Sequence, residues 1–127
     1  MKQMSLMSLC KDYGLSRRAI QGYEKIGLIR PDSKTSRGYL IYKEKTIRRI
    51  LLIRYFQNIG YHLKEIKDFI DKPNEVLKEK IRSKIKKLEE DLDNTEKLIN
   101  DSLAIIRLLD EKDSDEKIFA ITGKENI

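Results

Sequence analysis

Residues 5–27 read SLMSLCKDYGLSRRAIQGYEKIG, and most of the N-terminal architecture follows from this stretch. Its apolar residues recur at spacings of three and four on each side of Gly14, which is the pattern of two short amphipathic helices. Ser5 and Ser16 stand where each helix would begin, because a serine hydroxyl accepts a hydrogen bond from a free amide of the first turn. Gly14 and Gly27 suit the left-handed position after a helix end. The stretch therefore predicts a helix-turn-helix.

The residues after this motif predict a β-hairpin and two more helices. Two β-prone runs, 28–31 and 39–42, flank the polar and turn-rich stretch 32–38. Such a hairpin has an exposed basic tip beside the second helix, an arrangement known as a wing. Apolar spacing then predicts helices at about 43–59 and 63–70.

Composition limits the class of protein. Of the 127 residues 38% are charged, and Gly (6) and Pro (2) are scarce, which argues against a loop-rich or all-β domain. No apolar run approaches the ~18 to 20 residues of a membrane span, and the N-terminus lacks a signal-peptide core. One cysteine excludes an intramolecular disulfide. We therefore expect a mainly helical, cytoplasmic protein that does not enter membranes.

Charge is spread unevenly along the chain. Residues 1–73 hold 16 Lys and Arg against 7 Asp and Glu, a formal charge of +9. Residues 74–127 hold 11 against 14, a formal charge of −3. Such asymmetry points to a basic part that meets a polyanion and an acidic part with another role, although charge alone does not name the partner. The alternative is a lysine-rich surface with no such partner.

A long helix without Gly or Pro is predicted over 74–110, about 55 Å at 1.5 Å per residue. Its apolar stripe keeps a seven-residue period, interrupted only by Thr95 and Ser102. The small domain before it cannot cover a stripe of this length, so we expect the helix to pair with a second copy of itself. The alternative is a helix that folds back on its own domain. The expected dimer contacts are Ile85, Leu88, Leu92, Ile99, Ile106 and Leu109.

The chain is thus expected to have three parts. Residues 1–73 form the DNA-binding domain, 74–110 the dimerisation helix and 111–127 an acidic tail. The apolar run 118–121 in the tail would pack on the dimer, bind a partner or simply fray.

The second helix of a helix-turn-helix lies in the major groove with its N-terminal residues at the base edges. Arg pairs with a guanine edge and Gln with an adenine edge. The alternative is a set of solvated charges on a surface helix. On this helix the candidate contacts are Ser16, Arg17, Arg18 and Gln21.

Further contacts to DNA are expected outside this helix. A basic wing tip reaches a flanking phosphate or the minor groove, or is an ordinary solvated turn. Tyr23 either faces the core with its hydroxyl at the rim or contacts a phosphate. His62 and Lys64 open the fourth predicted helix, where free amides suit a phosphate. His62 is either a DNA contact there or a surface cap. These candidates are Tyr23, Lys34, Arg37, Tyr39, His62 and Lys64.

No constellation of residues predicts an enzyme. Cys10 lies on an apolar stripe and is interpreted as a small buried hydrophobe rather than a reactive thiol. His62 is the only histidine. There is no Gly-rich phosphate loop, catalytic carboxylate pair or nucleophile elbow. We expect no catalytic site, no metal site and no cofactor.

In four blocks the sequence resembles the MerR family of transcriptional regulators. The blocks are 13–20, 23–31, 37–42 and 59–67, and the resemblance extends over about residues 3–110. It implies a mainly α fold: a winged helix-turn-helix, a second helix pair acting as another wing, and an antiparallel two-helix coiled coil that forms a homodimer.

The resemblance also implies a function. Family members bind a pseudo-palindrome within an over-long promoter spacer and distort it so that RNA polymerase engages both promoter elements. Arg18 matches a DNA-contacting arginine, Tyr23 a tyrosine near the backbone, Arg37 the wing and Lys64 the second wing. The metal- and redox-sensing branches carry cysteines after the long helix, and this chain has none there, so any effector is another small molecule or a protein.

We therefore predict a homodimeric, sequence-specific DNA-binding regulator of transcription. One alternative is an adaptor whose coiled coil and tail recruit a protein partner. Another is an architectural DNA-binding protein with the same fold and no promoter role.

Overall fold

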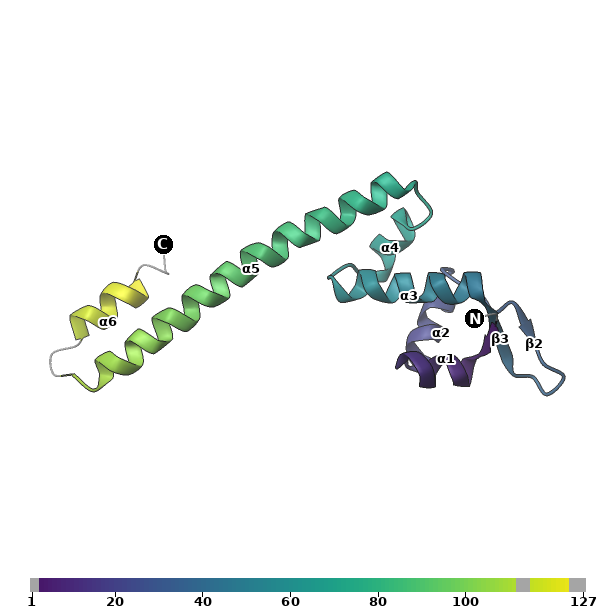
Figure 1. Cartoon of the computed structure of the whole chain (residues 1–127), viewed down its shortest axis with the longest axis horizontal. Helices are drawn as coiled ribbons and strands as arrows, with labels where there is room; N and C mark the ends of the chain where they lie inside the picture. Colours follow the sequence, from purple (N-terminus) through teal and green to yellow (C-terminus); the bar gives the residue numbers. More distant parts are fainter. Residues whose placement is uncertain (1–2, 112–114, 124–127) are drawn as a thin grey trace. The chain divides into compact units, whose positions relative to one another are not determined.

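The computed structural model describes residues 3–111 and 115–123 (Figure 1). The predicted mainly helical fold with a small hairpin and a long helix is confirmed. The elements in chain order are β1 Gln3–Ser5, α1 Leu6–Tyr13, α2 Arg17–Lys25, β2 Ser33–Lys34, β3 Leu40–Lys43, α3 Glu44–Asn58, α4 Leu63–Phe69, α5 Asn74–Leu109 and α6 Asp115–Thr122.

The two helices of the helix-turn-helix begin at the predicted caps. The Ser5 hydroxyl accepts a hydrogen bond from the Ser8 amide at 3.1 Å, and the Ser16 hydroxyl accepts one from the Ala19 amide at 3.0 Å. Gly14 ends α1 in the left-handed conformation, with φ of 65°. The two serine bonds fix where α1 and α2 start, because they satisfy amides that the first turn of a helix leaves open, and Gly14 marks where α1 stops.

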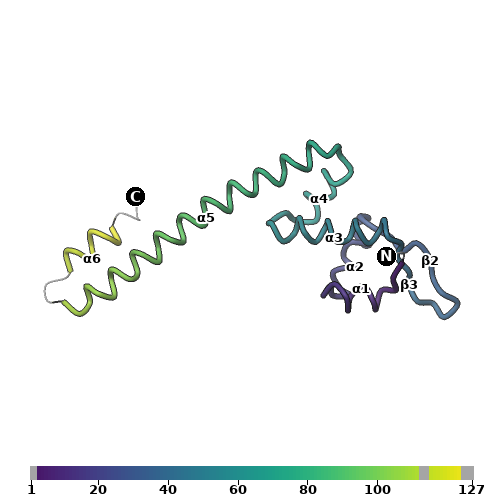
Figure 2. Tube along the Cα trace, in the orientation of Figure 1, coloured from purple at the N-terminus to yellow at the C-terminus, as the bar shows by residue number. Residues whose placement is uncertain are grey.

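A small antiparallel sheet in the order β1-β3-β2 borders these helices. Met4 pairs with Tyr42 on one side of β3, and Ser33 pairs with Ile41 on the other. In Figure 2 the hairpin of β2 and β3 extends away from the helices. The predicted wing is therefore present, and its tip lies between Lys34 and Leu40.

The predicted first strand of this hairpin is wrong. Residues 28–31 form no strand, and the strand that pairs with β3 is β2, inside the stretch predicted to be a turn. Leu28 and Ile29 are buried in the core instead, and the Leu28 carbonyl accepts a hydrogen bond from Arg49 Nε at 2.7 Å. The apolar character of these two residues therefore reflects burial in the core and not pairing in a sheet.

The core of the N-terminal unit is built around α3. Phe56 is fully buried, and its ring packs edge-on against Phe69 with 4.9 Å between centroids and against Tyr61 with 6.1 Å. This aromatic group holds α4 against the end of α3. The other large side chains that are fully buried among the described residues are Leu9, Ile20, Tyr23, Tyr42, Ile47, Ile50, Ile53 and Ile66.

The chain divides into two compact units at residue 82. The start of α5 belongs to the first unit, where Val76, Leu77 and Ile81 pack against the core. The Tyr61 hydroxyl donates a hydrogen bond to the Lys80 carbonyl at 2.8 Å, which further ties this part of α5 to the unit.

The second unit consists of the rest of α5 and of α6. The six side chains expected at the dimer contact lie along α5 and are 48% to 67% exposed. Within the expected tail, residues 115–122 form α6, in which Phe119 is 76% exposed, while 112–114 and 124–127 lie outside the described residues. Among the described helices none is both long and apolar enough to cross a membrane.

One core side chain gives the unfolding free energy a distinct pH dependence. Tyr42 is fully buried, its hydroxyl has no hydrogen-bond partner within the described residues, and burial, followed by the charge of Glu24, raises its pKa to about 12. In the unfolded chain tyrosine ionises near pH ~10. The contribution of Tyr42 to the free energy of unfolding is therefore fully present below pH ~10, and it is lost as the pH rises towards 12.

Between pH 10 and 12 we expect the parent to lose about 2 to 3 kcal/mol of unfolding free energy as Tyr42 ionises, and we expect Tyr42→Phe to show no such loss. At neutral pH the variant should be as stable as the parent or more stable, because an unpartnered buried hydroxyl is costly. Urea unfolding at several pH values measures both effects, with the exposed Tyr39→Phe as the matched control. Identical pH profiles for the parent and Tyr42→Phe would contradict this account.

Candidate nucleic-acid interface

The first turn of α2 presents polar side chains to solvent. Ile20 and Tyr23 are buried on the opposite side of the helix, which directs Arg17, Arg18 and Gln21 outward. No hydrogen bond or ion pair joins these three side chains to any other described residue. They are therefore available to an external ligand.

Ser16 has a structural role at the same place. Its hydroxyl caps α2 through the Ala19 amide, and its carbonyl accepts a hydrogen bond from the Ile20 amide at 3.3 Å. Ser16 remains exposed, so capping and contact with a ligand are compatible.

The wing tip is a structured turn. The Thr35 amide donates to the Tyr39 carbonyl at 2.9 Å, and the Tyr39 amide donates to the Thr35 hydroxyl at 3.1 Å. Gly38 adopts φ of 86° within this turn, a conformation that glycine tolerates best. Lys34 and Arg37 are exposed, and neither side chain bonds to another described residue.

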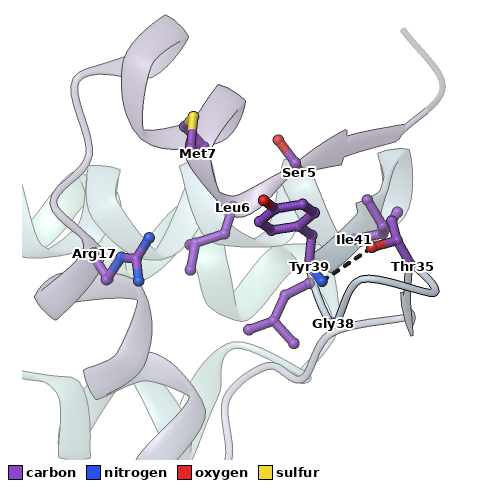
Figure 3. Close-up of a pocket in the computed structure, with 9 residues that line it drawn as sticks. Ser5, Leu6, Met7, Arg17, Thr35, Gly38, Tyr39 and Ile41 are labelled. Atoms are coloured by element: carbon purple, nitrogen blue, oxygen red, sulfur yellow. Dashed lines mark hydrogen bonds between the residues drawn. The ribbon is translucent and has the colours of Figure 1, made fainter.

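A pocket of about 400 Å³ lies between the wing, the first turn of α1 and the start of α2 (Figure 3). Leu6, which is 8% exposed, stands between Arg17 and Tyr39 in this view. Tyr39 is 56% exposed and Met7 67% exposed. The structure thus brings the predicted residues Arg17 and Tyr39 to one recess.

His62 and Lys64 lie at a separate place. Both are exposed at the start of α4, where the His62 amide donates to the Glu65 carboxylate at 3.0 Å. They line a recess together with Gln57 and with Ile26 from the end of α2. The structure does not bring them to the pocket beside the wing.

Tyr23 is placed differently from the predicted phosphate contact. Its side chain is 1% exposed, and its hydroxyl donates a hydrogen bond to Gln57 Oε1 at 2.6 Å. Burial raises its pKa, although the charge of Arg54 opposes this. The core-facing alternative therefore describes Tyr23, because the helix face that carries Ile20 also carries this ring.

Other cations of this unit have internal partners. The Arg49 guanidinium forms an ion pair with Asp71 at 2.6 Å, which holds the pKa of that carboxyl below its usual range. Three basic side chains donate to backbone carbonyls near the ends of α1 and α2: Arg49 to Leu28, Arg54 to Tyr13 and Lys67 to Ile26. These cations stabilise the fold and are less available to a polyanion than Arg17 or Arg18.

Sequence reasoning missed Met7 and Leu6 as lining residues of the pocket. A signal was present for Met7, since it stands off the apolar stripe of α1 and is a large hydrophobe on the polar side. Among the described residues there is no group of three or more side chains that would hold a metal ion.

The fold and this exposed face define the class: a winged helix-turn-helix protein of the kind that binds DNA. The model of the family described as "MerR HTH family regulatory protein" matches residues 4–72. The chain therefore belongs to the MerR family of DNA-binding transcriptional regulators, as its sequence blocks predicted, and this family does not consist of enzymes.

Curated relatives match the N-terminal region of this chain. The HTH-type transcriptional activator mta of Bacillus subtilis is 38% identical over 61 residues, 48% of this chain and 24% of that protein. A probable heavy metal-dependent transcriptional regulator of Haemophilus influenzae is 38% identical over 63 residues, 50% of this chain and 49% of that protein. The aligned part of the chain thus spans between a quarter and a half of these relatives.

Solved structures share the fold over most of the chain. A MerR-family regulator from Bacillus cereus has a TM-score of 0.70 at 17% identity and covers 97% of this chain and 98% of its own. HiNmlR, a MerR-family regulator lacking the sensor domain and solved bound to promoter DNA, has a TM-score of 0.65 at 19% identity, with coverage of 83% and 90%.

Proposed function

We propose that this chain acts in the cytoplasm as a homodimeric, sequence-specific regulator that binds a pseudo-palindromic promoter site. One observation carries the proposal: Arg17, Arg18 and Gln21 are exposed without internal partners on the first turns of α2, beside a basic wing. Residues 1–73 bind DNA, 74–110 dimerise, and 111–127 form a tail.

The apolar stripe of α5 supports pairing with a second copy. Its eight seam positions from Ile85 to Leu109 follow alternating steps of three and four, so the pattern is the same when read from either end about Lys97. An antiparallel pair centred there sets Ile85 against Leu109, Leu88 against Ile106, Leu92 against Ser102 and Thr95 against Ile99. Every seam residue then faces another one.

The two polar seam residues do not oppose such burial. The Thr95 hydroxyl donates to the Asp91 carbonyl at 2.8 Å, and the Ser102 hydroxyl donates to the Leu98 carbonyl at 2.7 Å. Each hydroxyl is therefore satisfied within its own helix, and the cost of burying an unbonded polar group does not arise.

Charge favours the antiparallel direction. Residues 74–88 hold 6 Lys and Arg against 2 Asp and Glu, whereas residues 89–109 hold 2 against 6. An antiparallel pair sets the basic half of one helix beside the acidic half of the other, while a parallel pair sets like charges together.

A two-fold dimer carries two copies of α2, so its binding site is expected to have two related half-sites. We propose that the bound dimer distorts the promoter spacer and thereby changes how RNA polymerase engages the promoter. The resemblance to the MerR family supports this step.

A footprint of the purified protein on the DNA upstream of its own gene tests the proposed function, at two salt concentrations. We expect a protected pseudo-palindrome within a promoter spacer that persists at the higher salt. Protection that is diffuse and vanishes with salt would reflect phosphate contacts alone and would overturn sequence-specific binding.

We expect Arg18→Ala to weaken binding to the protected site by about 1 to 3 kcal/mol and to reduce discrimination against unrelated DNA. The reason is that a guanidinium paired with a guanine edge reads sequence. Fluorescence anisotropy on both duplexes measures this, and Lys25→Ala at the other end of α2 is the matched control. A change of only a few tenths of a kcal/mol would remove Arg18 from the contacts.

A further inference from the structure

The pocket beside the wing combines one cation with an apolar wall. Arg17 contributes the guanidinium, while Leu6, Met7, Tyr39 and Leu40 are among the apolar side chains that line the pocket. No carboxylate is among the described residues that line it. A ligand that fits must therefore be anionic at one end and apolar beside it.

Two of the apolar side chains that line the pocket are exposed to solvent. Met7 and Tyr39 are two of the large hydrophobic side chains exposed in the N-terminal unit, and both line this one pocket. Exposed apolar surface gathered around a concave site marks a place of contact with a ligand. The pocket is also preformed, because two hydrogen bonds close the turn that carries Tyr39.

A deoxyribose phosphate has the required chemistry. Its phosphate carries a charge that Arg17 complements, and its sugar offers a carbon face suited to the apolar side chains of Met7 and Tyr39. The base edges of DNA instead offer neutral donors and acceptors. In a winged helix-turn-helix the backbone of one strand also has to pass between the recognition helix and the wing that flanks it.

We propose that this pocket holds one sugar–phosphate unit of the DNA backbone, so that Arg17 positions the protein on the duplex and does not read a base. Arg18 does not line the pocket, although it is the next residue. Successive residues of a helix point about 100° apart, so neighbouring arginines serve different surfaces of the ligand. This inference rests on the proposed DNA binding.

The test measures binding of the full-length protein to two duplexes of about 30 base pairs over a range of salt: the footprinted site and an unrelated sequence. We expect Arg17→Ala to weaken binding to both about equally, by roughly 3- to 10-fold, and to reduce the salt slope by about one. Arg17→Lys should retain most of the affinity, since a phosphate accepts a point charge. Lys72→Ala removes a cation away from the pocket and is the matched control.

Two further measurements complete the test. Met7→Ser should weaken binding to both duplexes without changing the salt slope, because it removes apolar contact and no charge. A neutral methylphosphonate placed at successive backbone positions should weaken the parent at one position and leave Arg17→Ala unaffected there.

The outcomes separate this inference from the proposed function. If Arg17→Ala weakens binding to the footprinted site alone and leaves the salt slope unchanged, Arg17 reads a base and the inference is overturned. The same holds if Met7→Ser binds both duplexes as the parent does. If the parent itself binds neither duplex, the proposed function fails.

Discussion

Replacing Ile99 with aspartate is expected to convert the protein to a monomer at micromolar concentration. A two-fold pair carries each substitution twice, so the variant loses two apolar side chains worth ~1.5 to 3 kcal/mol each. We therefore expect the dimer to weaken by about 3 to 6 kcal/mol, or roughly 100- to 20,000-fold in its dissociation constant. Sedimentation equilibrium measures this, and binding to a two-half-site operator should fall in parallel.

Asn100→Asp is the matched control, because it introduces the same carboxylate one residue away from the seam. This variant should remain dimeric. If Ile99→Asp also remains dimeric, or if the parent is a monomer by light scattering, the stripe of α5 does not join two copies of the chain.

Phe56→Ala is expected to lower the free energy of unfolding by about 3 to 5 kcal/mol. Phe56 is fully buried and is the ring on which Tyr61 and Phe69 both pack, so its removal leaves a cavity between α3 and α4. Because α4 carries Lys64 in its first turn, we also expect weaker DNA binding at temperatures where the variant is still folded.

Chemical denaturation followed by circular dichroism measures this loss. Phe56→Leu retains most of the buried volume and should cost clearly less. Leu52→Ala changes an exposed residue of the same helix and should have little effect. A loss below about 1 kcal/mol for Phe56→Ala would show that the aromatic group does not hold α4 in place.

Much of the fold is predictable because its determinants are local. Ser5 and Ser16 cap the two helices through bonds that span three residues, and Gly14 ends α1 by its left-handed conformation, so the sequence alone locates α1 and α2. The long α5 is equally predictable, since a run of helix formers without Gly or Pro has few alternatives.

Non-local packing limits the rest. The apolar run 28–31 resembles a strand, yet Leu28 and Ile29 fill the core beneath α2. Tyr23 is itself one of the predicted contacts, yet its hydroxyl bonds to Gln57, which is 34 residues away. Such partners are invisible to a pattern read along the chain.

The candidate site also has a part that the sequence predicts and a part that only the folded chain shows. Arg17, Arg18 and Gln21 are predictable because helical spacing places them opposite the buried face. The pocket that Arg17 lines, and Arg18 does not, is formed by residues of the wing, of α1 and of α2 that are distant in sequence, and Met7 joins it only in three dimensions.

Two sets of hydrogen bonds hold the end of α2 against the elements behind it. Lys67 of α4 holds the Ile26 carbonyl at 2.7 Å, and Arg49 links the Leu28 carbonyl to Asp71. The end of the recognition helix is thereby fastened to α4 and to the residues that follow it. These bonds fix the distance between the first turn of α2 and the first turn of α4. Under the proposed function, we therefore expect the DNA to deform wherever its own spacing does not match that distance.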